Sequence, residues 1–474
     1  MGAGVSMWRL ARAVAALGQL GVVSGTALDA ILARRLQLGD PDGDYRRALA
    51  AFPYPGVAER ILERYFIEGG KSPEAPFKSK PVPAIDPGPH LLELTVASNF
   101  VEVWLAREGH TGHVGINFLE KIQVPNVPSL FGAMLAGVDF VLMGAGIPRH
   151  IPGVIDRLAH GLAAELPIHV ETQGASAMHR FDPATFCGGP APSLKRPAFL
   201  AIVASATLGT MLAKKASGRV DGFVIEGPTA GGHNAPPRGE IRYNAEGEPL
   251  YGERDLVDYE VFRKLGLPFW LAGSFGRPGG LEAALALGAA GVQVGTAFAW
   301  CEESGIAPEI KRRVIEQVKL GTLRVRTDGR VSPTGFPFKL VQLPGTFADP
   351  AVAAKRKRIC DLGYLRHAYE KEDKSLGWRC PSEPERDYER KGGDFADTVG
   401  RLCVCNGLME TIGLGQTRPG GIQEPPMITS GDDLVNVAQF LGPGESTYRA
   451  RDVLEKLLGS EHAVVAAGGV AGGG

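Results

Sequence analysis

The sequence predicts an α/β protein whose main unit is a parallel (β/α)8 barrel, or TIM barrel, with an insertion and a C-terminal α-rich extension. Two observations lead to this fold. Short apolar segments of strand type alternate with helical segments, and repeated β/α units with short links imply a parallel sheet. The last three strands also break into glycine at their carboxyl ends, where α/β barrels keep their active sites.

Eight segments have the composition of barrel strands, because they are short, apolar and bounded by turn residues. Helical segments, with apolar residues three or four positions apart, lie between them. The expected strands are residues 21–24, 114–118, 140–143, 168–170, 198–203, 223–225, 268–271 and 292–294. The expected helices are residues 8–17, 28–36, 57–66, 101–108, 129–136, 153–161, 208–216 and 281–288.

The composition divides the chain into two parts. We expect residues 1–305 to form the barrel, with a polar, proline-rich insertion at about residues 39–89. From residue 306 the chain turns to charged helices and a Pro/Gly-rich section, and it holds four of the six cysteines. The glycine-rich residues 468–474 at its end are expected to be disordered.

Bulk composition narrows the class of protein. With 474 residues, 44% of them hydrophobic, the chain can bury the core of one large domain and an appended one. Its 51 basic and 52 acidic residues give a net charge of −1, so we expect neither nucleic acid nor a membrane surface as a partner. The sequence contains no run of eighteen apolar residues, so no membrane-spanning helix is predicted. Six cysteines in so long a chain favour a cytoplasmic protein over a disulfide framework.

Three glycine-rich loops carry the functional signal: Gly227 to His233, Leu271 to Gly276 and Gly291 to Thr296. Without a Cβ atom the backbone can approach a phosphate closely, and successive N–H groups can point at it. The 22-residue offset from Gly273 to Gly295 equals one strand–helix–strand step. The two loops should therefore lie side by side, as in the phosphate site of TIM barrels.

This set of loops resembles the FMN-dependent nitronate monooxygenases, formerly called 2-nitropropane dioxygenases. The flavin enoyl reductases of fatty acid and polyketide synthesis look similar in the same loops. The resemblance rests on Gly-Gly-His after one strand, Ala-Gly-Ser after the next and Val-Gln-Val-Gly-Thr after the last. Weaker matches are found at residues 1–6, 114–118 and 303–304, so scattered motifs cover roughly residues 1–340.

The resemblance implies FMN as the cofactor and proton transfer by His233 as the catalytic role. The cofactor-binding residues that it implies are Gly2, Ala3, Gly4, Asn117, Gly231, Gly232, Gly273, Ser274, Phe275, Gln293, Gly295 and Thr296. Plainer interpretations stand beside these roles. His233 could simply bond a loop carbonyl, the glycine loops could be tight turns, and Asn117 and Gln293 could be core amides.

The activity implied is the oxidation of an alkyl nitronate with O2 to a carbonyl compound and nitrite. The partners would then be a small-molecule substrate and O2, with a homo-oligomer left open. An FMN-dependent enoyl-thioester reductase is one alternative. A non-catalytic scaffold that binds flavin or phosphate is another.

Three features depart from the family's pattern. Thr229 stands where an acidic residue is usual, and residues 234–239 replace a shorter turn after His233. The family's first barrel strand normally precedes the position of Met1. We therefore expect either an upstream strand or another segment that closes the barrel.

No metal is predicted as the main interpretation of the cysteines. Cys360, Cys380, Cys403 and Cys405 could instead form a structural zinc site, although they lack the usual paired C-x2-C spacing. Buried free thiols are the commoner case. Cys187 and Cys301 have no evident partner in the sequence.

Overall fold

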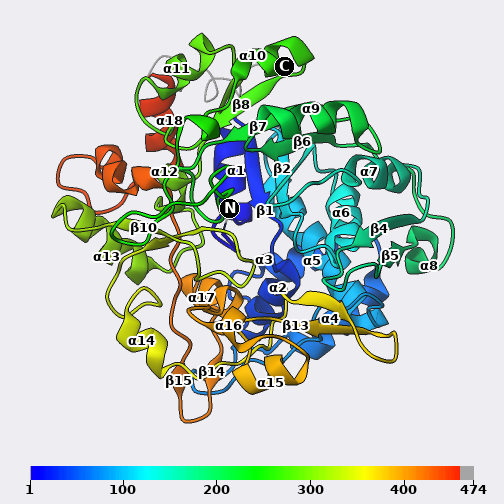
Figure 1. The fold of residues 1–474 in the computed structure, drawn as a ribbon. Coiled ribbons are helices and arrows are strands. Elements are labelled where there is room, and N and C mark those ends of the chain that lie inside the picture. Colours follow the sequence, from blue (N-terminus) through cyan, green and yellow to red (C-terminus); the bar gives the residue numbers. More distant parts are fainter. Residues whose placement is uncertain (1, 460–474) are drawn as a thin grey trace.

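The computed structural model describes residues 2–459 and shows a mixed α/β protein built on one parallel sheet (Figure 1). The sheet has seven strands in the spatial order β1-β2-β3-β6-β7-β8-β9. They are β1 (Gly21–Ser24), β2 (Val114–Leu119), β3 (Phe140–Gly144), β6 (Ala198–Val203), β7 (Gly222–Glu226), β8 (Phe269–Ala272) and β9 (Gly291–Gln293). The predicted α/β class with a parallel sheet is confirmed.

The register of the sheet aligns apolar residues beneath the outer helices. Val23 pairs with Ile116, and Ile116 pairs with Val141, on successive strands. All three side chains are fully buried. These strands are almost continuous apolar runs, because helices cover one face of the sheet and apolar side chains pack on the other.

The other face of the sheet curls around an apolar interior. Leu142, Leu200, Val224 and Ala272 form a cluster there, against which Val22 and Trp270 also pack. Other side chains on the same cluster are Phe140 and Ile202. Because Val22 lies on the first strand and Trp270 on the last but one, the two ends of the sheet must approach each other.

The sheet is not closed by hydrogen bonds among the described residues. Its ladder begins at β1 and ends at β9, which do not pair with each other, and no other part of residues 2–459 pairs between them. The expected strand at 168–170 is wrong as a member of this sheet. It ends β4 (Ala164–Ile168), which forms an antiparallel hairpin with β5 (Ala177–Phe181). Pro167 and the exposed Glu165 suit such an isolated hairpin better than a central strand.

Helices cover the outer face of the sheet and form the insertion. The longest, α5 (Pro89–Arg107), begins at a proline, which the first helical turn tolerates because its N–H group would be unpaired. The others up to β9 are α1 (Trp8–Ala16), α2 (Leu28–Gln37), α3 (Asp44–Ala50), α4 (Pro55–Tyr65), α6 (Asn126–Leu135), α7 (Ile151–Ala159), α8 (Pro183–Cys187), α9 (Ala206–Lys215), η1 (Glu253–Asp255), α10 (Tyr259–Leu265) and α11 (Gly280–Ala286). None of the described helices is both long and apolar enough to cross a membrane.

The C-terminal part contains three hairpins as well as helices, so the α-rich extension predicted from the sequence is in fact mixed. Its strands are β10 (Val325–Asp328), β11 (Phe338–Val341), β12 (His367–Glu370), β13 (Leu376–Arg379), β14 (Thr417–Arg418) and β15 (Ile422–Gln423). Its helices are α12 (Thr296–Ala299), which follows β9, α13 (Pro308–Lys319), α14 (Pro350–Lys355), α15 (Glu385–Arg390), α16 (Phe395–Thr398), α17 (Val404–Thr411), η2 (Asp432–Phe440) and α18 (Ala450–Leu458). The predicted disorder of residues 468–474 lies outside the described residues.

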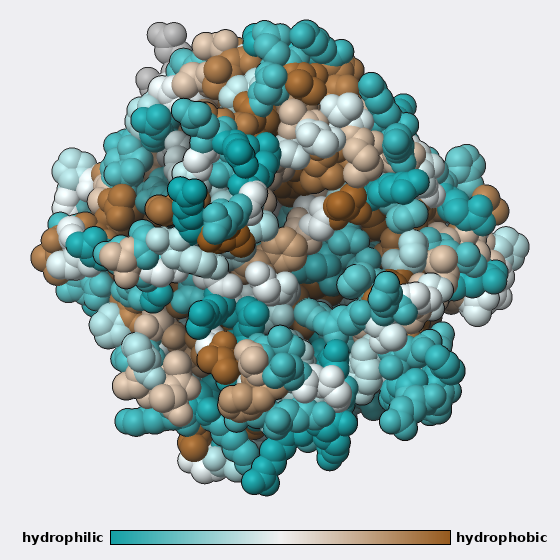
Figure 2. All heavy atoms as spheres, in the orientation of Figure 1, coloured by the Kyte–Doolittle hydropathy of each residue, from teal (hydrophilic) through white to brown (hydrophobic). Residues whose placement is uncertain are grey.

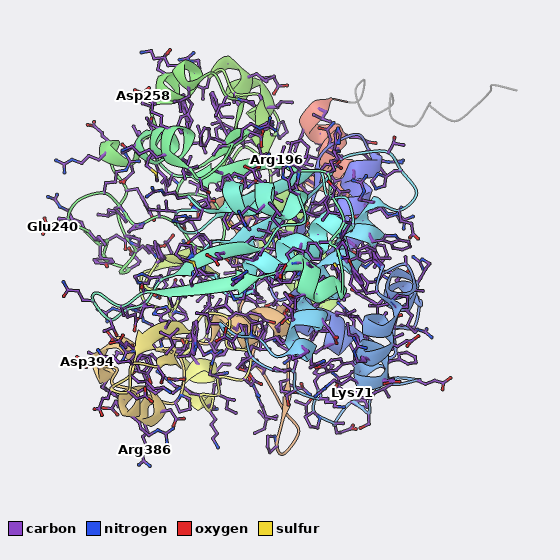
Figure 3. All side chains as sticks on the ribbon, turned by 90° about the vertical axis from the view of Figure 1, so that its right-hand side faces the viewer. Lys71, Arg196, Glu240, Asp258, Arg386 and Asp394 are labelled. Carbon is purple, nitrogen blue, oxygen red and sulfur yellow. The ribbon has the colours of Figure 1, made fainter. Side chains whose placement is uncertain are left out.

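The extension shares its core with the sheet and the insertion. Phe338, Tyr364 and Met427 belong to the same buried cluster as Ile31 and Ile116. In Figure 1 the yellow and orange segments around α16 and α17 lie beside the blue helices α2 and α4. Figure 3 places Arg386 and Asp394 of this part at the opposite end of the molecule from Asp258 on α10. The surface in Figure 2 is mostly hydrophilic, with apolar residues scattered over it and a hollow near its middle.

Candidate functional site

Two adjoining cavities lie at the carboxyl ends of the strands. The smaller, of ≈100 Å³, is lined by residues that include Asn117, Glu226 and His233. The larger, of ≈550 Å³, is lined by the loops after β8 and β9. Five residues line both cavities, namely Gly2, Glu226, Gly231, Gly232 and Thr429. The two cavities therefore adjoin each other, and together they form the candidate site.

Most of the predicted site residues converge on this pair of cavities. The smaller cavity takes Gly2, Ala3, Asn117, Gly231, Gly232 and His233. The larger takes Gly2, Gly231, Gly232, Gly273, Ser274, Phe275, Gln293, Gly295 and Thr296. Gly4 lines neither. Its φ of +65° and the close approach of its Cβ position to Ile412 Cδ1 explain the glycine, and its contact with a cofactor stays a prediction.

His233 is held by residues of the C-terminal extension. Its Nε2 lies 2.6 Å from Ser332 Oγ, and its ring meets that of Phe338 edge-on with centroids 4.8 Å apart. The backbone is fixed as well, because Lys339 N donates to Gly232 O and Asn234 N donates to Pro337 O. The imidazole thus has a defined orientation toward the cavity that it lines.

Nδ1 is the ring nitrogen of His233 that has no hydrogen bond to a described residue, and the direction of the Ser332 hydroxyl sets whether Nε2 carries the proton. Thr334 N donates to Ser332 Oγ, and the two hydroxyl oxygens lie 2.9 Å apart. When Ser332 donates to Thr334 Oγ1, its oxygen accepts from the Nε2–H group of His233. Nδ1, which has no hydrogen bond to any described residue, is then an acceptor. Burial, with the nearby Lys121 charge, lowers the pKa of His233 well below its ordinary value, so the ring is neutral at pH 7.

Two charged residues beside His233 escaped the sequence interpretation. Glu226 ends β7 and lines both cavities, and burial raises the pKa of its carboxyl group. Lys121 follows β2, and its Nζ is buried without a hydrogen-bond partner among the described residues. That Nζ lies 4.5 Å from the centroid of the Phe336 ring, and burial lowers the pKa of the amine to about 7. Glu226 directly follows the predicted strand 223–225, and this position was a signal for it; Lys121 lies three positions beyond the predicted strand 114–118.

The loops after β8 and β9 fit an anion. Gly273 has φ +96°, and a Cβ there would lie 2.9 Å from Thr229 Oγ1, so glycine is needed for this close approach. Gly295 has no atom within 4 Å of its Cβ position and therefore opens to free space. Gly273 N and Ser274 N donate to no carbonyl among the described residues. Backbone donors around open space form the kind of concavity that binds phosphate.

A segment of the extension crosses these loops. Residues 429–433, called the strap below, follow the buried Ile428. Thr429 Oγ1 accepts from Gly232 N at 2.9 Å, and Gly431 N donates to Thr296 Oγ1 at 3.0 Å. A Cβ at Gly431 would lie 2.7 Å from that same Thr296 oxygen, which explains the glycine.

The strap also brings a carboxyl group to the anion loops. Ser274, at φ 59°, donates from Oγ to Asp433 Oδ1 at 2.9 Å. Burial raises the pKa of Asp433, while this hydrogen bond acts in the opposite direction. The Ser274 hydroxyl thus donates to Asp433, its role as a donor to phosphate stays a prediction, and the backbone N–H groups remain as donors.

Comparison with known proteins matches one segment of the chain, which holds part of the site. Residues 189–333 match the family model described as nitronate monooxygenase. This segment contains the Gly231–His233 loop, both anion loops and Ser332. The resemblance that the sequence motifs predicted is confirmed over these residues.

Relatives of this chain share only part of their length with it. A probable nitronate monooxygenase of Bacillus subtilis is 37% identical over 108 residues, which cover 22% of this chain and 29% of the relative. Another from Staphylococcus haemolyticus is 33% identical over 131 residues, 27% of this chain and 35% of the relative. The chain thus spans about a third of the length of the curated relatives it matches.

Two solved structures are similar at low scores. FabK from Thermotoga maritima gives a TM-score of 0.47 at 15% identity and covers 98% of this chain and 91% of its own. A nitroalkane oxidase from Streptomyces ansochromogenes gives 0.39 at 16% identity, with 87% and 92% covered. Both scores are too low to carry an argument about this chain.

Proposed function

We propose that this chain is an FMN-dependent oxidoreductase that oxidises alkyl nitronates with O2 to a carbonyl compound and nitrite. The observation that carries the proposal is the position of the matched family segment. Residues 189–333 supply the histidine, its hydroxyl partner and both anion loops, and these meet around one pair of cavities. The scaffold we propose is the TIM barrel, of which the curled seven-stranded sheet forms the larger part.

The residues fit a flavin mononucleotide by their donor set and by their space. A cavity of ≈550 Å³ lies within the usual range for a small-molecule site. The backbone N–H groups of Gly273, Ser274, Gly295 and Thr296 would hold the phosphate. Asn117, buried at the end of β2, is placed to reach the ring system from the smaller cavity. When bound, a flavin supplies the electron chemistry, and the protein supplies position and proton transfer.

His233 is the residue that would move a proton. A neutral imidazole with a free Nδ1 can take the proton from the carbon next to a nitro group, which converts a neutral nitroalkane into its nitronate. The Ser332 hydroxyl then stabilises the N–H group on the other side of the ring. The role needs no other titratable side chain on the His233 loop.

Lys121 would favour an anionic substrate. Its Nζ is buried and lacks a hydrogen-bond partner among residues 2–459. Its acidic neighbour Glu226 lines both cavities, so a negative charge there would also stabilise the charged amine. A nitronate carries such a charge. Burial raises the pKa of Glu226 to about 7, so its carboxyl group opposes this attraction less below that pH than above it.

The test is turnover of the flavin-loaded protein with two substrate sets. From a preformed nitronate we expect two nitrite ions and two carbonyl molecules for each O2 consumed. Oxidation of NAD(P)H with an enoyl thioester, without nitrite from any nitronate, would instead assign an enoyl reductase. Bound flavin without turnover of either substrate would leave a binding scaffold.

A further inference from the structure

Four cysteines from three separate parts of the C-terminal extension line one internal cavity. Cys360 lies in the loop after α14, Cys380 directly follows β13, and Cys403 and Cys405 lie at the start of α17. All four are among the ten residues that line this cavity. The cavity itself is small, with a volume of ≈10 Å³, so the four cysteines lie around a confined space.

The four thiols are unpaired and lie close enough to affect one another. No disulfide joins any of the six cysteines. A hydrogen bond with Cys380 lowers the pKa of Cys360, and the Arg366 guanidinium acts in the same direction. Burial raises the pKa of Cys403. Four free thiols around one buried cavity are an unusual arrangement, since buried cysteines normally behave as inert hydrophobic residues.

The other two cysteines have a different environment. Cys187 Sγ lies 2.7 Å from the hydroxyl oxygen of Tyr54, which is 133 residues away in the sequence. Cys301 is fully buried and donates from Sγ to Phe298 O at 3.0 Å. Each is satisfied by a local oxygen atom, and neither lines the four-cysteine cavity.

An ionic network fixes the segments that carry the four cysteines. Asp361, next to Cys360, accepts from Arg418 Nη1 and from Asn406 Nδ2, both at 2.7 Å. Glu424 accepts from Arg356 and Arg418. The guanidinium groups of Arg356 and Arg366 also lower the pKa values of Cys403 and Cys360, respectively. Such surrounding bonds orient ligands, and nearby cations offset the negative charge of several thiolates.

We propose that Cys360, Cys380, Cys403 and Cys405 ligate an iron–sulfur cluster of the [4Fe–4S] type. Four cysteine thiolates are the ligand set of such a cluster. A single zinc ion does not fit as well, because within residues 2–459 no three His, Cys, Asp or Glu side chains converge closely enough to hold one ion. A polynuclear cluster bridges thiols that stand farther apart than the ligands of one ion.

The cluster would stand directly beside the candidate active site. Leu365, Val404 and Cys405 line both the four-cysteine cavity and the cavity that contains His233. One layer of side chains therefore separates the two spaces. The proposal itself rests on the thiols alone and does not depend on the oxidase function.

The experiment measures iron and acid-labile sulfide per chain in full-length protein purified without oxygen. About four of each are expected, with an electron paramagnetic resonance signal after reduction by dithionite. The FMN content is measured separately in the same samples. A failure of the proposed function and a failure of the cluster proposal can then be told apart. Wild-type protein with one zinc, or with less than about one iron and no sulfide, would overturn the proposal.

Serine variants locate the ligands. Cys360→Ser, Cys380→Ser, Cys403→Ser and Cys405→Ser should each fall below about one iron per chain. The matched controls Cys187→Ser and Cys301→Ser should keep the wild-type content. If a ligand variant fails to fold, removal of iron from the wild type by a chelator and its reconstitution with iron and sulfide give the same count. Equal losses in the controls and the ligand variants would contradict the assignment.

Discussion

The two walls of the cavity around His233 are built in different ways. The strand ends contribute glycine, backbone and a few charged residues, as at Gly231, Gly232 and Glu226. The C-terminal extension contributes the side chains that hold the imidazole and close the cavity, among them Phe338, Tyr364 and Thr429. The first wall gives open space and donors for a ligand. The second gives orientation, and it comes from residues far away in sequence.

The comparison teaches that the two walls should fail in different ways. A change in the glycine wall should alter what binds, because it changes space and charge where a ligand would lie. A change in the extension wall should alter how well a bound substrate reacts, because it changes the setting of His233.

The largest effect is expected from a charge in the glycine wall. Gly295 has φ −113° and an open Cβ position, so Gly295→Asp fits the fold without strain. Two like charges about 4 Å apart repel by about 4 kcal/mol near a protein surface, so FMN affinity should fall on the order of a hundredfold or more. Flavin fluorescence titration measures it. The uncharged Gly295→Asn is the control, and equal losses in both variants would mean that no phosphate lies there.

His233→Asn should come next, with a loss on the order of a hundredfold in turnover of a neutral nitroalkane at unchanged FMN content. A preformed nitronate needs no proton abstraction, so its oxidation should suffer less. Because the pKa of His233 is lowered, the wild-type rate with nitroalkane should persist below pH 6.5 and fall only at more acid pH. Steady-state assays with both substrates decide it, and equal losses would make His233 a binding residue.

Lys121 should set a pH dependence of substrate affinity. With a pKa of about 7, the amine is charged below that pH and loses its charge above it. The KM for a nitronate should therefore rise by about tenfold from pH 6 to pH 8, the effect of about 1.4 kcal/mol. Glu226 and Glu120, which face the amine, ionise in the same direction and add to the rise. Lys121→Arg should keep the KM low throughout, and Lys121→Met should keep it high. Glu226 and Glu120 remain in Lys121→Met, so a small rise should persist there, whereas a full tenfold rise in that variant would exclude the amine as its source.

The smallest effect is expected from the extension wall. Ser332→Ala removes one hydrogen bond to His233, worth about 0.5–1.5 kcal/mol, so kcat for nitroalkane should fall about threefold to tenfold. The KM should hardly change, because the substrate does not need this hydroxyl to bind. Ser332→Thr keeps the hydroxyl and should recover most of the rate, while Thr334→Val should have a smaller effect than Ser332→Ala. A change confined to KM would place Ser332 in substrate binding.

The sequence predicted the glycine wall better than the extension wall for a physical reason. Strand ends and glycine loops are local patterns, so seven of the eight expected strands and the loops at Gly231, Gly273 and Gly295 lie where they were predicted. The strand at 168–170 was misplaced because its apolar run was weighed without the neighbouring Pro167, a residue that central strands disfavour. The contact of Ser332 with His233 spans 99 residues, and no local pattern encodes it.

The four cysteines show the same limit in another form. Their spacing alone argued against a metal, since no C-x2-C pair is present. Only the folded chain brings Cys360 and Cys405 to one cavity. Gly4 shows a related limit, because the need for glycine beside Ile412 depends on a contact between residues far apart in sequence.

The strap gives the order in which the site can be assembled. It meets the loops after β7, β8 and β9 across 197, 159 and 135 residues. A chain made from its N-terminus exposes those loops to the solvent well before Thr429 leaves the ribosome. Bringing together residues so far apart in the chain also costs conformational entropy and slows folding. We therefore expect the growing chain to remain without its flavin until synthesis is almost finished, so that loading of the cofactor reports the completion of the fold.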